Sequence, residues 1–212
     1  MDAKFWHDRW QEGRLGFHEG KVNRLLEAHI GALALGEGAR IFVPLCGKAV
    51  DIPWLLSRGY RVAGAELSEI AVRDLFDEMG VTPEVTELGA LRRYVAQGVE
   101  IFVGDIFDLT AETLGAVDAV YDRAALVALP QEMRRRYAAH LAAITERAPQ
   151  LLVTFEYDQS VMPGPPFSLS EAEVRACHAE RFTIAELADE EVPGGLKGIC
   201  PAREKAVLLR SR

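Results

Sequence analysis

Residues 40–66 read RIFVPLCGKAVDIPWLLSRGYRVAGAE. Residues 41–43 form a short apolar run, and residues 60–65 form a second run that stops at Glu66. Between them, residues 49–58 carry apolar side chains at the spacing of one helix face. A helix that joins two apolar strands makes a right-handed crossover, so this stretch predicts a parallel strand–helix–strand unit.

The same alternation continues on both sides of this unit. We expect helices at residues 5–10, 23–33 (with Asn23 as the cap), 68–79 (with Ser68 as the cap), 131–147 and 170–180, and strands at 99–103, 117–121, 151–155, 182–187 and 205–209. Residues 84–96 are ambiguous between irregular structure and an inserted hairpin. The last two strands are joined by a loop, which indicates an antiparallel edge on a mostly parallel sheet.

Composition narrows the class of protein. A chain of 212 residues favours one domain. The net charge of −8 disfavours a nucleic-acid partner, and no apolar run approaches a membrane span or a signal peptide. The three cysteines are widely spaced, which indicates neither a disulfide framework nor a metal knuckle. We therefore expect a cytoplasmic protein, without a metal, that works as a monomer.

Chemistry is expected beyond the carboxyl ends of the parallel strands, because ligands of such sheets bind there. The turn after the first strand contains Gly47 but lacks the G-x-G-x-x-G pattern, and Lys48 lacks the spacing of a phosphate-binding loop. Glu66 lies about twenty residues past that turn, where nucleotide-binding sheets place an acid on ribose hydroxyls. The alternative is a helix-capping acid near Ser68.

Two further strand ends carry polar residues. Asp105 follows the third strand, where its carboxylate can accept from an adenine amino group while Ile106 packs on the ring; an acid at a strand end is also common for structural reasons. Arg123 follows Asp122 at the fourth strand end, where it either holds a ligand carboxylate or forms a surface ion pair. No nucleophile elbow or metal-binding histidine pair is present, so the site favours binding and positioning over covalent catalysis.

Several motifs, taken in chain order, resemble the bacterial thiopurine S-methyltransferases. They are Phe5-Trp6 with Trp10, Gly16-Phe17-His18, Val43-Pro44-Leu45-Cys46-Gly47-Lys48, Gly64-Ala65-Glu66-Leu67-Ser68, Gly104-Asp105-Ile106-Phe107, Tyr121-Asp122-Arg123-Ala124-Ala125-Leu126 and Pro163-Gly164-Pro165-Pro166-Phe167-Ser168. The resemblance implies a Rossmann-like, mostly parallel seven-stranded α/β sheet with helices on both faces and an antiparallel edge. It also implies S-adenosylmethionine as methyl donor, S-adenosylhomocysteine as product, and methylation of aromatic or heterocyclic thiols such as thiopurines.

Residue roles also follow from the resemblance. It implies that the cofactor contacts Trp10, Leu45, Glu66, Asp105, Ile106 and Arg123. It implies an acceptor pocket lined by Phe17, His18, Pro166 and Phe167. No residue is singled out as a catalytic base, because a thiol that is partly ionised near neutral pH needs little help. Residues 193–198 contain no arginine, although family members often carry one there, which leaves the acceptor open.

The amino-terminal region is expected to be a helical lid, with residues 1–35 closing over a Rossmann-like core of residues 36–212. Trp10 is assigned to the lid, whereas Trp6 is expected only to pack its helix onto the core. Three alternatives stay open: a nicotinamide-dependent oxidoreductase on the same sheet, a protein that binds S-adenosylmethionine without turnover, and a methyltransferase for selenium or tellurium oxyanions.

Overall fold

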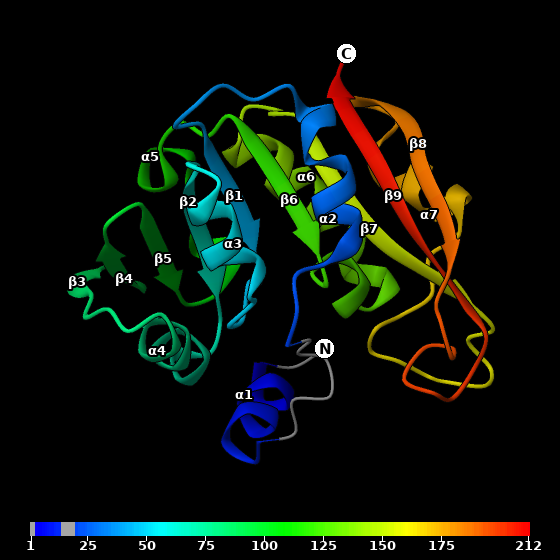
Figure 1. Ribbon diagram of the computed structural model, residues 1–212, viewed down its shortest axis with the longest axis horizontal. Coiled ribbons are helices and arrows are strands. Elements are labelled where there is room, and N and C mark those ends of the chain that lie inside the picture. The colour runs from blue at the N-terminus through cyan, green and yellow to red at the C-terminus, as the bar shows by residue number, and fades with distance from the viewer. Residues whose placement is uncertain (1–2, 14–19) are drawn as a thin grey trace.

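The computed structural model describes residues 3–13 and 20–212. In this part of the chain, nine strands form one mixed sheet in the order β3-β4-β5-β2-β1-β6-β7-β9-β8 (Figure 1). The strands are β1 (Arg40–Pro44), β2 (Arg61–Glu66), β3 (Glu84–Leu88), β4 (Leu91–Ala96), β5 (Val99–Val103), β6 (Ala119–Arg123), β7 (Gln150–Tyr157), β8 (Phe182–Glu191) and β9 (Ala202–Ser211). Strands β5, β2, β1, β6 and β7 are parallel, and β9 runs antiparallel between β7 and β8.

The expected mostly parallel sheet with an antiparallel edge is present, but it has nine strands instead of the expected seven. The ambiguous residues 84–96 form the hairpin β3–β4, which pairs antiparallel with β5 and extends the sheet at that edge. All five residues of β3 are exposed, so its apolar and charged side chains give no buried face that could have predicted a strand.

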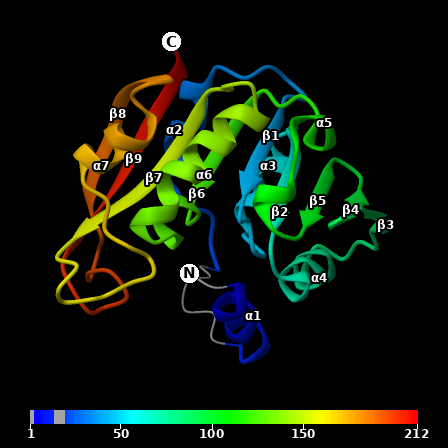
Figure 2. The same cartoon turned by 180° about the vertical axis from the view of Figure 1, so that it is seen from behind.

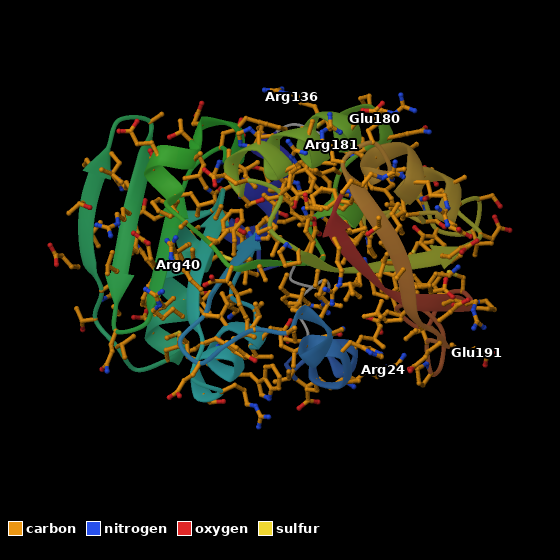
Figure 3. The ribbon with its side chains drawn as sticks, turned by 90° about the horizontal axis from the view of Figure 1, so that it is seen from above. Arg24, Arg40, Arg136, Glu180, Arg181 and Glu191 are labelled. Carbon is orange, nitrogen blue, oxygen red and sulfur yellow. The ribbon has the colours of Figure 1, made fainter. Side chains whose placement is uncertain are left out.

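Helices α2 to α7 cover the two faces of the sheet, and α1 lies at its end (Figure 1). The helices are α1 (Ala3–Gln11), α2 (Arg24–His29), α3 (Asp51–Ser57), α4 (Glu69–Glu78), α5 (Ala111–Leu114), α6 (Gln131–Ile144) and α7 (Glu171–His178), with 3₁₀ turns η1 (Ile30–Leu33), η2 (Ile106–Asp108) and η3 (Leu126–Ala128). Figure 2 shows α5, α6 and α7 on one face. Seen from above, Arg136 of α6 and Arg24 of α2 lie on opposite sides of the sheet (Figure 3).

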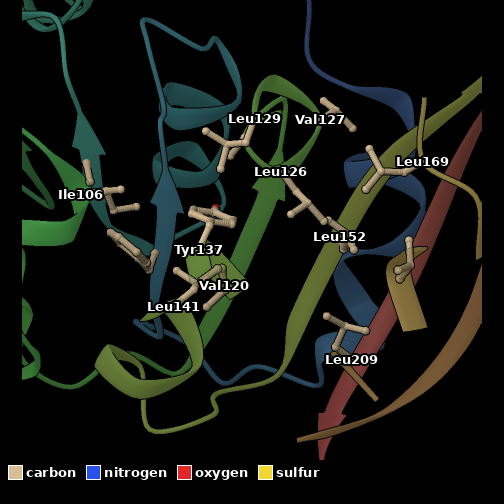
Figure 4. Packing of buried hydrophobic residues seen from close by; sticks show 14 of the residues in the cluster. Ile106, Val120, Leu126, Val127, Leu129, Tyr137, Leu141, Leu152, Leu169 and Leu209 are labelled. Atoms are coloured by element: carbon tan, nitrogen blue, oxygen red, sulfur yellow. The ribbon is translucent and has the colours of Figure 1, made fainter. Parts of the chain in front are cut away.

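Each face has its own apolar core, because successive residues of a buried strand point to opposite sides. Val120 and Leu152 pack toward Tyr137 and Leu141 of α6 (Figure 4). Tyr121 belongs to the opposite cluster, which is built with α2, α3 and α4. Parallel strands buried on both faces read as continuous apolar runs, which is why β1 and β7 were visible in the sequence.

Helix ends follow local chemistry. The Asn23 side chain accepts hydrogen bonds from the backbone N–H groups of Leu25 and Leu26, so the predicted cap is confirmed. Ser68 is the N-cap residue of α4, as predicted, but its side chain makes no cap hydrogen bond; its backbone N–H donates to Glu66. Ser170 begins α7 with a capping box.

The described part of the chain contains no helix long and apolar enough to span a membrane. Among the same residues, no group of three or more histidine, cysteine or acidic side chains is placed to hold a metal. Cys46, Cys177 and Cys200 are free and buried. The cysteines therefore pack as small apolar side chains.

Candidate active site

A cavity of about 540 Å³ opens at the carboxyl ends of the parallel strands, within the range of small-molecule sites. Helix α1 lies across this end of the sheet (Figure 1). The cavity brings together seven of the residues predicted from the sequence: Trp10, Leu45, Glu66, Asp105, Ile106, Arg123 and Pro166. They come from α1 and from the ends of β1, β2, β5, β6 and β7, so only the fold assembles them.

The turn after β1 forms the floor of the cavity beneath α1. Leu45 and Gly47 both have positive φ angles, 47° and 52°, and the Cys46 N–H donates to the Ala65 carbonyl at 2.9 Å. A Cβ at Gly47 would lie 3.3 Å from Cζ2 of Trp10. Gly47 is thus required both by the backbone conformation and by the close approach of the indole. Positive φ in a residue such as Leu45 is typical of functional sites.

Glu66 fastens this turn to the next helix. Its Oε2 accepts from the Gly47 N–H at 2.7 Å and its Oε1 from the Ser68 N–H at 2.8 Å. Burial raises the pKa of Glu66, and the backbone hydrogen bonds partly offset this. Each carboxylate oxygen can accept a further bond, so Glu66 can hold the loop and a ligand hydroxyl pair together.

The end of β5 shapes a second part of the cavity. Asp105 is exposed, and its Oδ1 accepts from the Phe107 N–H at 3.0 Å, which starts the turn η2. Ile106 is buried and turned to the cavity. Its carbonyl accepts from Nε2 of His140 on α6 at 2.8 Å. The turn that presents Asp105 and Ile106 is therefore tied to a core helix.

Asp122 and Arg123 have different environments. Asp122 is fully buried, and its oxygens accept from the Leu126 N–H at 3.0 Å and the Tyr137 hydroxyl at 2.8 Å. Burial raises the pKa of Asp122 to about 6. A surface ion pair between Asp122 and Arg123 is thus wrong: Asp122 anchors the turn after β6, while Arg123 is half-buried and lines the cavity.

The expected acceptor residues are less completely assembled. Pro165 and Pro166 line the cavity. Phe167 is not among the lining residues that the structure describes; its ring lies under the Arg134 guanidinium, 5.4 Å away. Phe17 and His18 lie outside the described residues. Trp6, expected only to pack, does line the cavity and meets Phe5 edge to face.

A buried polar network beside the cavity escaped the sequence analysis. The Asp51 carboxylate accepts from the Asn23 backbone N–H at 2.8 Å and the Tyr121 hydroxyl at 3.1 Å. The Asn23 side chain donates to Glu204 at 2.9 Å. All four residues are buried, and Asp51, Tyr121 and Glu204 line the cavity. The only sequence signal for this network is that two polar residues, Asp51 and Tyr121, stand beside motif residues.

Comparison with known proteins gives the family. The model of the thiopurine S-methyltransferase family matches residues 1–206. A thiopurine S-methyltransferase of Xanthobacter autotrophicus is 58% identical over 210 residues, covering 99% of each chain. One of Gluconobacter oxydans is 51% identical over 208 residues, covering 96% of this chain and 94% of its own.

Solved structures agree on the fold. The Burkholderia thailandensis 1,6-didemethyltoxoflavin-N1-methyltransferase, which holds S-adenosylhomocysteine, has a TM-score of 0.67 at 18% identity and covers 99% of this chain and 87% of its own. The magnesium protoporphyrin IX methyltransferase of Synechocystis, also with S-adenosylhomocysteine, has a TM-score of 0.64 at 17% identity, covering 99% of this chain and 100% of its own. The family match confirms the expected methyltransferase and contradicts the alternative of a nicotinamide-dependent oxidoreductase. The chain belongs to the thiopurine S-methyltransferase family.

Proposed function

We propose that this protein transfers a methyl group from S-adenosylmethionine to the sulfur of an aromatic or heterocyclic thiol of the thiopurine kind. The observation that carries the proposal is the cavity: one space that gathers Glu66, Asp105 and Arg123 from three strand ends under Trp10. Family membership supports the same reaction. The small-molecule acceptor, cytoplasmic location and monomeric state belong to this proposal.

The residues present fit the cofactor. Glu66 retains acceptor capacity for ribose hydroxyls after its two backbone bonds, and Gly47 leaves room for close approach. In our proposal Asp105 and Ile106 hold the adenine, Trp10 and Leu45 pack on the cofactor, and Arg123 binds its carboxylate. We assign contact with the acceptor to Phe17, His18, Pro166 and Phe167.

Bound S-adenosylmethionine supplies an electrophilic methyl group on a sulfonium. The protein's part is to hold the acceptor sulfur in line with that methyl group and to exclude water. Water exclusion favours the transfer, since a thiolate and a sulfonium react to two neutral thioethers and no proton has to move. A mostly apolar cavity under Trp6 and Trp10 provides this environment.

We further propose that residues 1–35 act as a lid over the core of residues 36–212. Trp10 is only 6% exposed because it lies against Gly47 across the cavity floor. Hydrogen exchange over residues 5–21 should slow when S-adenosylhomocysteine is added. Unchanged exchange would mean that this region is permanently packed helix rather than a lid.

The deciding experiment uses labelled S-adenosylmethionine with a panel of thiols, selenols and selenium or tellurium oxyanions. We expect methylation of thiopurines and aromatic thiols. Turnover of the oxyanions alone would replace the thiol acceptor with the metalloid alternative. Tight binding of S-adenosylmethionine without turnover of any acceptor would make the chain a binding protein and contradict the proposal.

A further inference from the structure

Turn η2, which carries the residues proposed for the adenine, is shaped mostly by bonds within itself. The Asp105 carboxylate uses Oδ1 for the Phe107 N–H, and its Oδ2 accepts no hydrogen bond from any residue that the structure describes. The Asp108 N–H donates to the Asp105 carbonyl at 2.9 Å, and the Leu109 N–H donates to the Ile106 carbonyl at 3.2 Å. These bonds set the shape of the turn, but they do not fix its position relative to the sheet.

The sheet itself holds the chain only up to the start of this turn. The pairing of β5 with β2 ends at Val103, and the next N–H, that of Gly104, donates to the Glu66 carbonyl at 2.9 Å. Residues 105–108 make no hydrogen bond to another strand within the described part of the chain. Asp105 is exposed, so water competes for its carboxylate whenever the turn is displaced.

Helix α6 supplies a hydrogen bond that fixes the turn from outside. Nε2 of His140 lies 2.8 Å from the Ile106 carbonyl, and because a carbonyl can only accept, Nε2 must carry the proton. His140 is half-buried and is not among the lining residues that the structure describes. It therefore acts on the cavity only through the turn that it holds.

The Phe107 side chain gives α6 a second contact with the same turn. Phe107 lines the cavity, and its ring meets the His140 ring edge to face with the centroids 5.3 Å apart. The Arg136 guanidinium lies over the Phe107 ring, 3.8 Å from the centroid. Arg136 and His140 are four residues apart, so they share one face of the helix. That face holds both the backbone and a side chain of η2.

The exact place of Asp105 matters because purine bases differ at the atom that it would meet. A carboxylate oxygen can only accept, so Oδ2 of Asp105 matches the exocyclic amino group of adenine. Hypoxanthine carries an oxo group at the same position, which is an acceptor and is repelled. Hydrogen bonds weaken steeply when their distance or angle is poor. A small displacement of the turn should therefore abolish the choice between the two bases before it abolishes binding.

We propose that His140 and Arg136 are positioning residues for adenine recognition, which hold turn η2 so that Oδ2 of Asp105 meets the exocyclic amino group of the methyl donor. This rests on the proposed use of S-adenosylmethionine. His140 acts through the Ile106 carbonyl and Arg136 through the Phe107 ring. The choice of adenine is thus set from α6, by side chains that do not line the described cavity.

The test compares, by calorimetry, the binding of S-adenosylhomocysteine with that of its deaminated form, S-inosylhomocysteine. Wild-type protein should bind the adenine form about tenfold more tightly or better, the effect of one hydrogen bond to a charged group. His140→Phe keeps a ring beside Phe107 but removes the donor, and the ratio should fall to about threefold or less. His140→Gln, whose amide can donate to the Ile106 carbonyl, should keep most of the ratio. Arg136→Met should lower it by about twofold, because an exposed cation–π contact is weak.

His29→Phe is the matched control. It makes the same substitution at a half-buried histidine at the end of α2 that is not among the described lining residues, and it should leave the ratio unchanged. The ratio separates positioning from folding, since a variant that is merely less stable binds both ligands more weakly by the same factor.

The outcomes distinguish this inference from the proposed reaction. A wild-type ratio in both His140→Phe and Arg136→Met overturns the inference even when S-adenosylmethionine is the methyl donor. Equal binding of the two ligands by wild-type protein also overturns it, because there is then no choice of base to be positioned. Failure of thiol methylation, with the ratio responding to His140→Phe as expected, contradicts the proposed reaction and supports the inference.

Discussion

Glu66 offers the sharpest test of the cofactor assignment, because one carboxylate both fastens the cavity floor and is expected to hold the ribose. In Glu66→Gln, one of the two backbone N–H groups, at 2.7 and 2.8 Å, meets an amide NH₂ instead of an acceptor. Loss of a hydrogen bond to a buried charged group should lower the free energy of unfolding of the unliganded protein by about 1.5–3 kcal/mol. The variant should still fold.

Cofactor affinity should fall by a comparable amount, about 2 kcal/mol or roughly thirtyfold in Kd. The two effects separate in urea unfolding with and without S-adenosylhomocysteine. At a ligand concentration of about 100 Kd, wild type gains ~2.7 kcal/mol, whereas a thirtyfold weaker variant gains only about 0.9 kcal/mol. Glu69→Gln is the control, because Glu69 bonds Tyr94 and Arg73 and does not line the cavity. A ligand-induced gain in Glu66→Gln equal to that of wild type would refute the assignment.

Four further predictions concern the strands and turns around the cavity. A Cβ in Gly64→Ala would lie 2.5 Å from Cδ1 of Ile101, so the variant should lose about 1–3 kcal/mol of stability by urea unfolding, and Ile101→Val should restore part of it in the double mutant. Because the pKa of Asp122 is raised to about 6, the folded protein binds that proton more tightly than the unfolded chain, and stability should fall as pH rises from about 4 to 6. Tyr137→Phe should cost about 1.5–3 kcal/mol at pH 8, where Asp122 is a carboxylate, and only about 0.5–1.5 kcal/mol at pH 5; equal costs at both pH values would contradict this. Arg123→Lys should raise the KM for S-adenosylmethionine, since lysine lacks the planar fork; a change confined to the acceptor's KM or to kcat would move Arg123 to the acceptor.

The sequence predicted the central sheet because its strands are buried on both faces. Their continuous apolar runs, and the turn residues after them, gave the order of elements and the parallel crossovers without any tertiary information. The strand-end residues Glu66, Asp105 and Arg123 were visible for the same reason: they follow apolar runs, and ligands of such a sheet bind beyond the carboxyl ends of its strands.

The bounds of some strands and the hydrogen-bond partners of some residues could not be predicted from the sequence in this way. The hairpin β3–β4 is exposed and pairs only at the sheet edge, so its residues carry no strong periodic signal. Ser68 has the residue type of a helix cap and stands at the cap position, yet its side chain makes no cap hydrogen bond, and its backbone N–H donates to Glu66 at 2.8 Å.

Charge environment was decided by tertiary structure alone. Asp122 and Arg123 are neighbours in sequence, and the alternation of a strand sends one into the core with Tyr137 and the other to the cavity. Arg9 and Lys197 are separated by nearly the whole chain, and no spacing rule relates a first helix to the loop before a last strand. They line the same cavity only because the fold brings α1 and the loop between β8 and β9 to the carboxyl ends of the parallel strands (Figure 1).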